Sequence, residues 1–329
     1  MRVKASAPGK VILFGEHSVV YRGPAVVLAI DRRVHVSVEP REDELLFVDA
    51  SSLGLSGFFN GEKYTSLVGG SIGEERLKPI WVAAKGVMER LGRRIGINLS
   101  VTSEFPIAVG LGSSAAAAVA TVAAVGELLE GRLISEEISL LAFEAEKVVH
   151  GMPSGIDNTI ATYGGGLVYE KGREAEQLRG LGDVPFVIGN TGVSRSTGQL
   201  VGRVGELRER NRMVVDSILD TISRVAQLGR DALLEGDLLR VGELMNINHG
   251  LLWALGVSSP ELDRLVNAAL NAGALGAKLT GAGGGGCMIS LAIPERIDGI
   301  SDAIGRSGGF PLRVRVSNSG VRVWKEEDR

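Results

Sequence analysis

The sequence predicts an α/β protein with two domains. The chain has 329 residues, which is enough for two domains of ordinary size. Its first third is rich in short β-branched segments, whereas helical periodicity dominates much of the remaining sequence. Between residues 171 and 185 the composition becomes charged and rich in glycine, which indicates a boundary. We therefore expect one domain at residues 1–180 and a second at 181–329.

Composition and charge exclude several classes of protein. The chain has 36 Lys and Arg against 39 Asp and Glu, so its net charge of −3 favours neither a nucleic-acid nor a membrane partner. Cys287 is the one cysteine, which excludes an intramolecular disulfide, and the four histidines are scattered, which excludes a zinc-type cluster. The N-terminal segment lacks the apolar core of a signal peptide. We expect a cytoplasmic protein.

The first third predicts mainly strands. Apolar, β-branched runs predict strands at residues 11–14, 25–30 and 34–38, and the charged triplet at 31–33 predicts a tight turn between the second and third. Residues 41–73 predict further strands and loops. A helix is expected at 77–91 and a strand with alternating apolar residues at 97–103.

Helical segments dominate the rest of the chain. Alanine-rich residues 115–129 predict a helix, with two serines where an N-cap is expected. A second helix is expected at 136–149, followed by a turn at 164–166 that leads into a strand at 167–169. After a strand at 186–188, the periodicity predicts one long amphipathic helix through residues 204–225. The remaining expected elements are helices at 237–255, 259–272 and 295–306 and a strand at 312–316.

The segment GLGSSAA, residues 110–116, lies between a predicted strand and a predicted helix. Its glycines allow close backbone approach, and the free amides at the helix N-terminus attract anions. Ser113 and Ser114 add hydroxyls for a phosphate or for a phosphate-bound Mg²⁺. A simple capped helix is the alternative. The Walker pattern is absent, and the dinucleotide fingerprint lacks its acidic residue at the end of a second parallel strand.

Two further segments combine acidic residues or glycines in loops. In EKVVHGMPSGIDN, Glu146 is either a solvated helix residue or a metal ligand, and Asp157 is either a turn residue or a carboxylate that orients or deprotonates a hydroxyl. KLTGAGGGGC, residues 278–287, is either a backbone nest for oxyanions or a closely packed turn. Cys287 fits a small core residue better than a nucleophile.

The N-terminal segment PGKVILFGEHSVV places charges at both ends of an apolar strand. Lys10 precedes the apolar run, and Glu16 and His17 follow it. Charges beside a buried strand are costly unless they are paired. They are therefore either surface residues or members of a shared site.

Three of these segments, PGKVILFGEHSVV, PIAVGLGSSAA and KLTGAGGGGC, resemble the three motifs of the GHMP kinase superfamily in the same order. The resemblance extends over nearly the whole chain. Within the superfamily the chain is most similar to the mevalonate kinase family, as GEHSVVY, EKVVHGMPSGIDN and NTGVSRST indicate. The resemblance implies an N-terminal nucleotide-binding domain like ribosomal protein S5 domain 2, a C-terminal ferredoxin-like α/β domain, and an active site in the cleft.

The resemblance also implies an activity, Mg²⁺-dependent transfer of phosphate from ATP to the 5-hydroxyl of mevalonate, and a role for each matching residue. Asp157 orients or deprotonates the hydroxyl, Lys10 stabilises negative charge, and Ser114 and Glu146 bind Mg²⁺. Residues implied to bind ATP are Pro106, Gly110, Leu111, Gly112, Ser113, Ser114 and Ala115. Residues implied to bind mevalonate are Glu16, His17, His150, Ser154, Arg195, Ser196, Thr197, Gly281, Ala282 and Gly283.

Other functions remain open from the sequence. Another GHMP kinase, acting on phosphomevalonate or homoserine, would share the phosphate loop, but the segments around His17 and His150 favour mevalonate. A non-catalytic sensor would be expected to have lost part of the set formed by Lys10, Ser114, Glu146 and Asp157, and all four are present. A nicotinamide oxidoreductase lacks its ribose-binding acid. A homodimer is left open.

The chain departs from the family pattern at two places. Arg22 and Gly23 stand where a glycine is expected directly after Tyr21, so the turn there is expected to differ. Gly192 and Ser194 stand where relatives often have Lys and Pro, which affects a supporting contact. The chain is also shorter than animal mevalonate kinases, so feedback inhibition by prenyl diphosphates is not assumed.

Overall fold

The computed structural model describes residues 1–106, 109–150, 153–194 and 196–326, and for residues 148–150 it describes the backbone alone. The chain forms two compact units. Unit 1 comprises Met1–Lys10, Arg32–Gly164 and Ser319–Arg329, and unit 2 comprises Val11–Asp31 and Gly165–Asn318. Both units combine strands with helices, so the prediction of a two-domain α/β protein is confirmed. The domain limits expected from composition, 1–180 and 181–329, stay a prediction.

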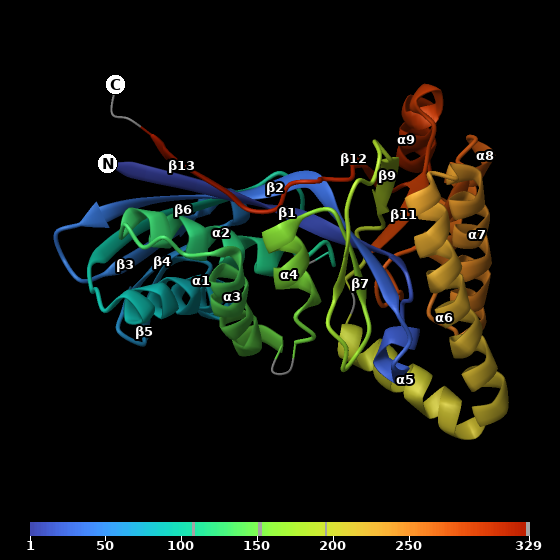
Figure 1. Cartoon of the computed structure of the whole chain (residues 1–329), viewed down its shortest axis with the longest axis horizontal. Coiled ribbons are helices and arrows are strands. Elements are labelled where there is room, and N and C mark those ends of the chain that lie inside the picture. Colours follow the sequence, from blue (N-terminus) through green and yellow to red (C-terminus); the bar gives the residue numbers. More distant parts are fainter. Residues whose placement is uncertain (107–108, 151–152, 195, 327–329) are drawn as a thin grey trace. The chain divides into compact units, whose positions relative to one another are not determined.

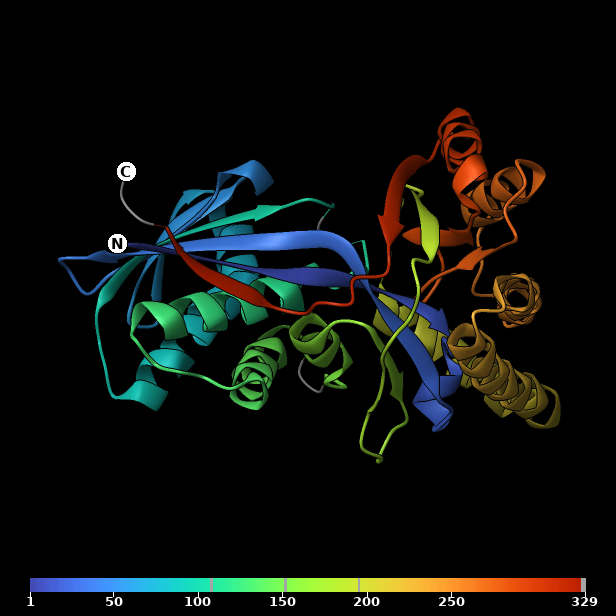
Figure 2. The same cartoon turned by 45° about the horizontal axis from the view of Figure 1, so that its top comes forward.

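Unit 1 is built on a mixed sheet with the strand order β13-β1-β2-β6-β3-β4-β5 (Figure 1). Its strands are β1 (Arg2–Phe14), β2 (Ala25–Arg41), β3 (Leu46–Ala50), β4 (Leu55–Asn60), β5 (Lys63–Val68), β6 (Gly96–Ser103) and β13 (Arg322–Glu326). The pair β3 and β6 is parallel, whereas β13 runs antiparallel to β1, and β6 antiparallel to β2. The last strand of the chain therefore lies beside the first, as Figure 2 shows.

Four helices lie on one face of this sheet (Figure 1). They are α1 (Gly70–Leu91), α2 (Ser113–Leu128), α3 (Ser135–His150) and α4 (Ile156–Tyr163), and a 3₁₀ turn at Ser51–Leu53 follows β3. Helix α2 is buried on nearly all sides, which its alanines allow because small side chains permit close packing with α1, α3 and α4. This packing positions the start of α2, which lies within the segment GLGSSAA, residues 110–116 (the glycine-serine segment).

Unit 2 contains a four-stranded antiparallel sheet in the order β10-β11-β9-β12. Its strands are β9 (Pro185–Asn190), β10 (Gly276–Leu279), β11 (Cys287–Leu291) and β12 (Phe310–Arg315), and its helices are α5 (Thr197–Arg210), α6 (Arg212–Glu235), α7 (Leu238–Ala254), α8 (Pro260–Asn271) and α9 (Ile297–Arg306). The first residues of β2 pair with β7 (Gly166–Tyr169), which pairs with β8 (Glu176–Leu178). Short 3₁₀ helices lie at Ser18–Tyr21 and Pro294–Arg296.

One hydrophobic core joins the helices of unit 2 to its sheet. Aliphatic side chains of α6, α7 and α8, such as Ile222, Leu252 and Leu262, pack with Leu279 of β10 and Met288 of β11. Most of the expected elements are present, and Cys287 is buried in β11, as expected of a core residue. Among the described residues, no helix combines the length and the apolar character that spanning a bilayer requires.

The tight turn expected at residues 31–33 is wrong, because β2 continues through it. Arg33 is buried and donates to the Ser6 hydroxyl and to the backbone carbonyls of Ser6, Ser319 and Gly320. Burial lowers the pKa of its guanidinium to about 10. Asp31 accepts a hydrogen bond from the Arg315 backbone. A charged triplet can stay in a strand when its members find such partners, which a local sequence pattern does not reveal.

The single long helix expected through residues 204–225 is also wrong. Helix α5 ends at Arg210 and α6 begins at Arg212, with Asn211 in a non-helical conformation (φ −135°) between them. Arg208 and Asp216 form an ion pair across the break. The apolar periodicity continues on both sides, so it cannot reveal the break, whereas an Asn is a residue type that often caps helices.

Some helix ends and short strands also differ from expectation. Helix α1 begins at Gly70 rather than near residue 77. Gly112, in the left-handed region, is the N-cap of α2, so Ser113 and Ser114 lie in the first turn and not at the cap. Strands β8, β10, β11 and β13 have no counterpart among the expected elements.

Replacement of Arg33 by Met should destabilise the protein by about 3 kcal/mol, because it leaves several buried carbonyl oxygens without their donor. Denaturant unfolding, followed by circular dichroism, measures the change. The exposed residue Arg94, replaced in the same way, is the control and should change the free energy of unfolding by less than about 0.5 kcal/mol. Equal stability of the two variants would contradict a structural role for Arg33.

Candidate active site

Lys10 and Asp157 form the centre of a polar cluster in unit 1. Lys10 lies on β1, and its backbone N–H donates to the Leu111 carbonyl at 2.8 Å. Asp157 lies in the first turn of α4, which begins after Gly155 in the left-handed region. The Lys10 Nζ is 3.2 Å from the Asp157 Oδ1. The ammonium group is largely buried, whereas the carboxylate is 31% exposed and so remains open to a ligand.

The glycine-serine segment packs directly against the Lys10 side chain. A Cβ at Gly112 would lie 2.8 Å from the Lys10 Cγ, and the backbone there has φ +75°. Only glycine meets both requirements without strain. Because Gly112 offers no side-chain acceptor to the first amides of α2, these N–H groups and the positive end of the helix dipole favour an anion.

Glu146 completes this cluster from α3. It is 4% exposed, and the Ser114 hydroxyl lies close enough to its carboxylate to lower the pKa of that carboxyl. The pKa of its carboxyl is raised to about 7, chiefly by burial and then by the negative charge of Asp157, whereas Lys10 and Ser114 act in the opposite direction. The alternative of a solvated helix residue is therefore wrong. The structure brings together all four residues expected to act in catalysis and metal binding, namely Lys10, Ser114, Glu146 and Asp157.

The donor set of this cluster fits a hard divalent cation. Glu146 and Ser114 supply oxygen atoms, and a cation would compensate a buried carboxylate that lies close to a second one. Within the described ranges, no three side chains of His, Cys, Asp or Glu are grouped closely enough to form a metal site on their own. Mg²⁺ commonly takes its remaining ligands from phosphates and water.

In unit 2, the residues that follow β1 form a tight turn. Gly15 has φ +93°, and a Cβ there would lie 2.1 Å from the Pro24 carbonyl oxygen. His17 also has a positive φ, of 62°, although it carries a side chain. Arg22 takes the left-handed position at the end of the following 3₁₀ helix, and Gly23 packs closely against Ser223. That this turn differs from the family pattern stays a prediction.

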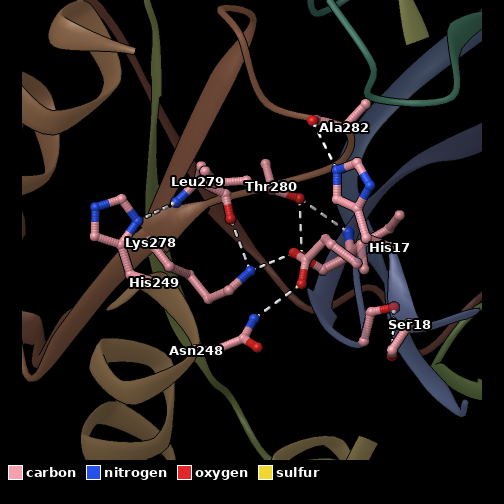
Figure 3. Close-up of polar contacts among 11 residues, drawn as sticks. His17, Ser18, Asn248, His249, Lys278, Leu279, Thr280 and Ala282 are labelled. Atoms are coloured by element: carbon pink, nitrogen blue, oxygen red, sulfur yellow. Dashed lines mark hydrogen bonds and ion pairs between the residues drawn. The ribbon is translucent and has the colours of Figure 1, made fainter. Parts of the chain in front are cut away.

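Glu16 and His17 are buried, so the alternative that they are surface residues is wrong. Glu16 is 1% exposed and forms an ion pair with Lys278, which is fully buried (Figure 3). Asn248 donates from Nδ2 to the other Glu16 oxygen at 2.9 Å, and Lys278 also donates to the Leu279 carbonyl at 2.7 Å. Burial raises the pKa of Glu16 and lowers that of Lys278, whereas their attraction opposes both shifts.

His249 lies beside this pair on α7 (Figure 3). Its Nδ1 accepts a hydrogen bond from the Leu279 N–H at 3.4 Å, and its Nε2 is 3.5 Å from the Asp263 Oδ1. Burial lowers the pKa of His249, and the Lys278 charge lowers it further, while Asp263 acts in the opposite direction. A neutral imidazole is also what the bond from Leu279 requires, since Nδ1 must be unprotonated to accept it.

The glycine loop, residues 280–286, joins β10 to β11. A Cβ at Gly283 would lie 1.9 Å from the Val257 carbonyl oxygen, and that oxygen accepts from the Gly284 N–H at 2.7 Å. At the other end, Gly286 exchanges backbone hydrogen bonds with Thr191 and Val193. Close packing therefore accounts for Gly283. Ala282 and Gly283 are buried, whereas Gly281 is partly exposed.

The remaining expected site residues lie at helix starts or outside the described part of the structure. Ser154 is exposed just before α4, in unit 1. In unit 2, Ser196 is the N-cap of α5 and Thr197 its first residue, and both are exposed. The His150 side chain and the whole of Arg195 lie outside the described residues. In unit 1, Pro106 and Gly110 are exposed.

Sequence reasoning missed the polar residues that surround Glu16. Sequence patterns indicate Lys278 only as the first residue of KLTGAGGGGC, residues 278–287, and they give no role to Asn248 or His249. One signal was available for Asn248. It lies on the same face of α7 as the buried residues Val241, Met245 and Leu252, and a polar residue among such positions indicates a buried partner.

Comparisons with known proteins agree on one family. Residues 78–166 match the family described as GHMP kinases N terminal domain, and residues 230–309 match GHMP kinases C terminal. Proteins named mevalonate kinase from Thermococcus sibiricus and Pyrococcus abyssi are both 43% identical to this chain over 98% of its length, covering 98% and 97% of their own. The protein of that name from Archaeoglobus fulgidus is 42% identical over 90% of this chain and 94% of its own.

Solved structures show the same relationship. The L. major mevalonate kinase in complex with R-mevalonate has a TM-score of 0.82 and 31% sequence identity, with 96% of each chain covered. The Methanococcus jannaschii mevalonate kinase has a TM-score of 0.82 and 28% identity, with 96% of this chain and 98% of that chain covered. A Lactococcus lactis galactokinase at 22% identity shares the fold, with a TM-score of 0.74.

The stability of the protein should fall in mildly acidic solution, in part because of His249. Its pKa in the folded state lies below the ordinary value of 6.5, so the unfolded chain binds more protons than the folded one. The stabilisation that His249 provides is complete above pH 6.5 and is lost as the pH falls below it. Unfolding curves measured across this pH range test the effect.

The His249→Asn variant should lose part of this acid sensitivity, because Asn can accept from the Leu279 N–H without titrating. The exposed residue Gln227, changed to Asn, serves as the control and should leave the acid sensitivity in place. If the His249 variant shows the same pH dependence as the native protein, the neutral state of His249 is not what stabilises the fold.

Proposed function

Because the chain belongs to the GHMP kinase family and is a phosphotransferase, we propose that it transfers a phosphoryl group from ATP to the 5-hydroxyl of mevalonate with the help of Mg²⁺. Its similarity over nearly the full length to relatives named mevalonate kinase supports the choice of substrate. The chemistry is supported chiefly by one observation, the contact of Lys10 with Asp157 beside Ser114 and Glu146.

Asp157 and Lys10 act on the attacking hydroxyl. The hydroxyl oxygen forms a bond to the γ-phosphorus while the bond between that phosphorus and ADP breaks. The exposed part of the Asp157 carboxylate accepts the hydroxyl proton. Asp157 acts as a base if the proton moves before the new phosphorus–oxygen bond forms, and as an orienting group if the proton moves afterwards. The Lys10 ammonium holds Asp157 in place and stabilises negative charge that develops on the attacking oxygen.

The start of α2 binds the phosphates of ATP. The backbone amides after Gly112 and the helix dipole offer a site for anionic oxygens. Contact between Gly112 and the Lys10 side chain keeps this site close to the catalytic pair. The proposed ATP-binding residues are Pro106, Gly110, Leu111, Gly112, Ser113, Ser114 and Ala115.

Ser114 and Glu146 hold Mg²⁺. When bound there, Mg²⁺ neutralises phosphate charge that develops during transfer. The Glu146 carboxylate supplies the negative ligand, and burial in α3 keeps it in position. The Ser114 hydroxyl lowers the pKa of the Glu146 carboxyl, so the two oxygen donors lie close together.

Recognition of mevalonate falls mainly to residues of unit 2. His17 is supported in this role by its fixed ring, whose Nε2 lies 2.9 Å from the Ala282 carbonyl oxygen. Glu16, the neighbour of His17 in the chain, belongs to the same proposed set. The other proposed mevalonate-binding residues are His150, Ser154, Arg195, Ser196, Thr197, Gly281, Ala282 and Gly283.

A substrate panel tests the proposed function. Purified protein with ATP and Mg²⁺ is assayed for ADP release with mevalonate, phosphomevalonate, homoserine and galactose. Mevalonate should give the highest kcat/KM, and mass spectrometry of the product should show one added phosphate. A clear preference for another alcohol would reject the substrate and keep the kinase class.

Loss of either catalytic group should reduce the rate far more than it reduces ATP binding. Asp157→Asn and Lys10→Met should each lower kcat by about 100-fold or more, because each removes a group that acts in the transition state. Steady-state kinetics give kcat, and calorimetric titration gives the affinity for ATP. The matched control is Lys147→Met on the surface of α3, which should stay within about twofold of the native kcat. Near-native turnover of the Asp157 variant would reject its assignment.

Glu146→Gln should increase the Mg²⁺ requirement. Loss of the negative ligand should raise the Mg²⁺ concentration for half-maximal rate by about tenfold or more. The rate is measured over a range of free Mg²⁺ at fixed ATP. Glu144→Gln, an exposed change on the same helix, should leave the Mg²⁺ curve unchanged. If both variants give the native curve, Glu146 does not hold the metal.

A further inference from the structure

In unit 2, the end of β1 and the turn after it contact the segment around the glycine loop at three successive points. Thr280 accepts a hydrogen bond from the Ile12 N–H at 3.2 Å and donates to the Ile12 carbonyl at 2.8 Å. The Glu16 and Lys278 side chains pair, and the His17 ring contacts the Ala282 carbonyl (Figure 3). These contacts fix the position of one segment against the other.

Both oxygens of the Glu16 carboxylate already have partners within the protein. One oxygen pairs with Lys278, and the other accepts from Asn248. The side chain is 1% exposed, and Lys278 is completely buried. A ligand could bind this carboxylate directly only by displacing one of these partners, which would leave a buried charge poorly compensated.

His17, by contrast, is held in an unfavourable backbone conformation. Its φ of 62° and ψ of −44° are rare for a residue that carries a Cβ. Glu16 is its direct neighbour in the chain, and the Ser18 N–H donates to the Glu16 carbonyl at 2.7 Å. Such strain persists only where surrounding contacts determine the conformation, and the Glu16 side chain supplies the strongest charged contact of this turn.

We propose that Glu16 and Lys278 are positioning residues, which hold His17 and the glycine loop in the geometry that recognises the alcohol substrate. Neither side chain contacts the substrate. This inference rests on the proposed function and sharpens it, because it moves Glu16 from substrate binding to the support of His17. The neutral His249 and Asn248 complete the environment of the pair, and Asp263 lies behind His249.

The decisive comparison is between single variants and a double variant that replaces the ion pair by a neutral pair. Glu16→Gln and Lys278→Met each leave one buried charge without its partner. Each should raise the KM for mevalonate by about tenfold or more, with the KM for ATP changed less than about twofold. In the double variant Glu16→Gln/Lys278→Met no charge remains, and Gln can still accept from Asn248.

The double variant should recover most of the lost mevalonate KM, together with the thermal stability. A direct contact of Glu16 with the substrate predicts a different result, in which the melting temperature recovers but the KM stays as high as in Glu16→Gln. A purely structural role predicts lower melting temperatures with unchanged KM in the single variants. Either of these results overturns the proposal.

If this double variant folds poorly, a double-mutant cycle of Glu16 with His17 tests the proposal instead. Because the pair acts through His17, adding Glu16→Gln to His17→Ala should raise the mevalonate KM by less than about twofold. If the increases in mevalonate KM of the two single variants multiply in the double variant, the two residues act independently, and the proposal is overturned. The control is Asp216→Asn, which breaks an exposed ion pair in the same unit and should leave both KM values unchanged.

The kinetics of the wild-type protein with mevalonate are measured alongside every set of variants. If the wild type fails with mevalonate but accepts another alcohol of the panel, the proposed substrate is rejected. The same variants are then compared on the accepted alcohol, so the positioning role is judged separately.

Discussion

The buried pair of Glu16 and Lys278 is the constraint on which the geometry of unit 2 depends. Neither charge is tolerable in the protein interior without the other, so any folded state must keep them together. This requirement brings the end of β1 to the end of β10. The chain turns sharply at this point, where Gly15 has φ +93° and His17 has φ 62°.

The polar cluster of unit 1 solves a different electrostatic problem. Two carboxylates, Glu146 and Asp157, share one lysine, and the more buried of them has its pKa raised to about 7. The arrangement is therefore short of positive charge. Such a deficit would be a defect in a purely structural core, whereas it suits a site that receives a cation together with its ligand.

Local patterns in the sequence predicted most of the helices and the residues of the unit 1 cluster. Helix α2 is predicted by its alanines and by the glycine before it, and the core of β1 is predicted by the apolar run after Lys10. In each case the residues that predict the element lie within or next to it. The predictions that failed concern features that depend on partners remote in sequence. The charged triplet ending at Arg33 stays within a strand, and carbonyls near residue 320 accept hydrogen bonds from the Arg33 side chain.

Two further failures have the same kind of cause. The break at Asn211 leaves the apolar periodicity intact on both sides, so periodicity cannot register it. The partner of Glu16 lies 262 positions away, and nothing near Glu16 identifies Lys278 as that partner. The resemblance of separate motifs to one family indicated a common function for them, but it did not indicate that Glu16 pairs with Lys278.

The pairing of the last strand with the first has a consequence for how the protein is made. Lys4 on β1 and Glu326 on β13 form an ion pair although they are 322 positions apart, and β13 shields one edge of β1. On the ribosome, β1 emerges before β13, and that edge stays unpaired until β13 has been synthesised. Unit 1 therefore completes its sheet only once β13 is available, and a nascent chain cut short before β13 exposes an edge that can pair with other chains.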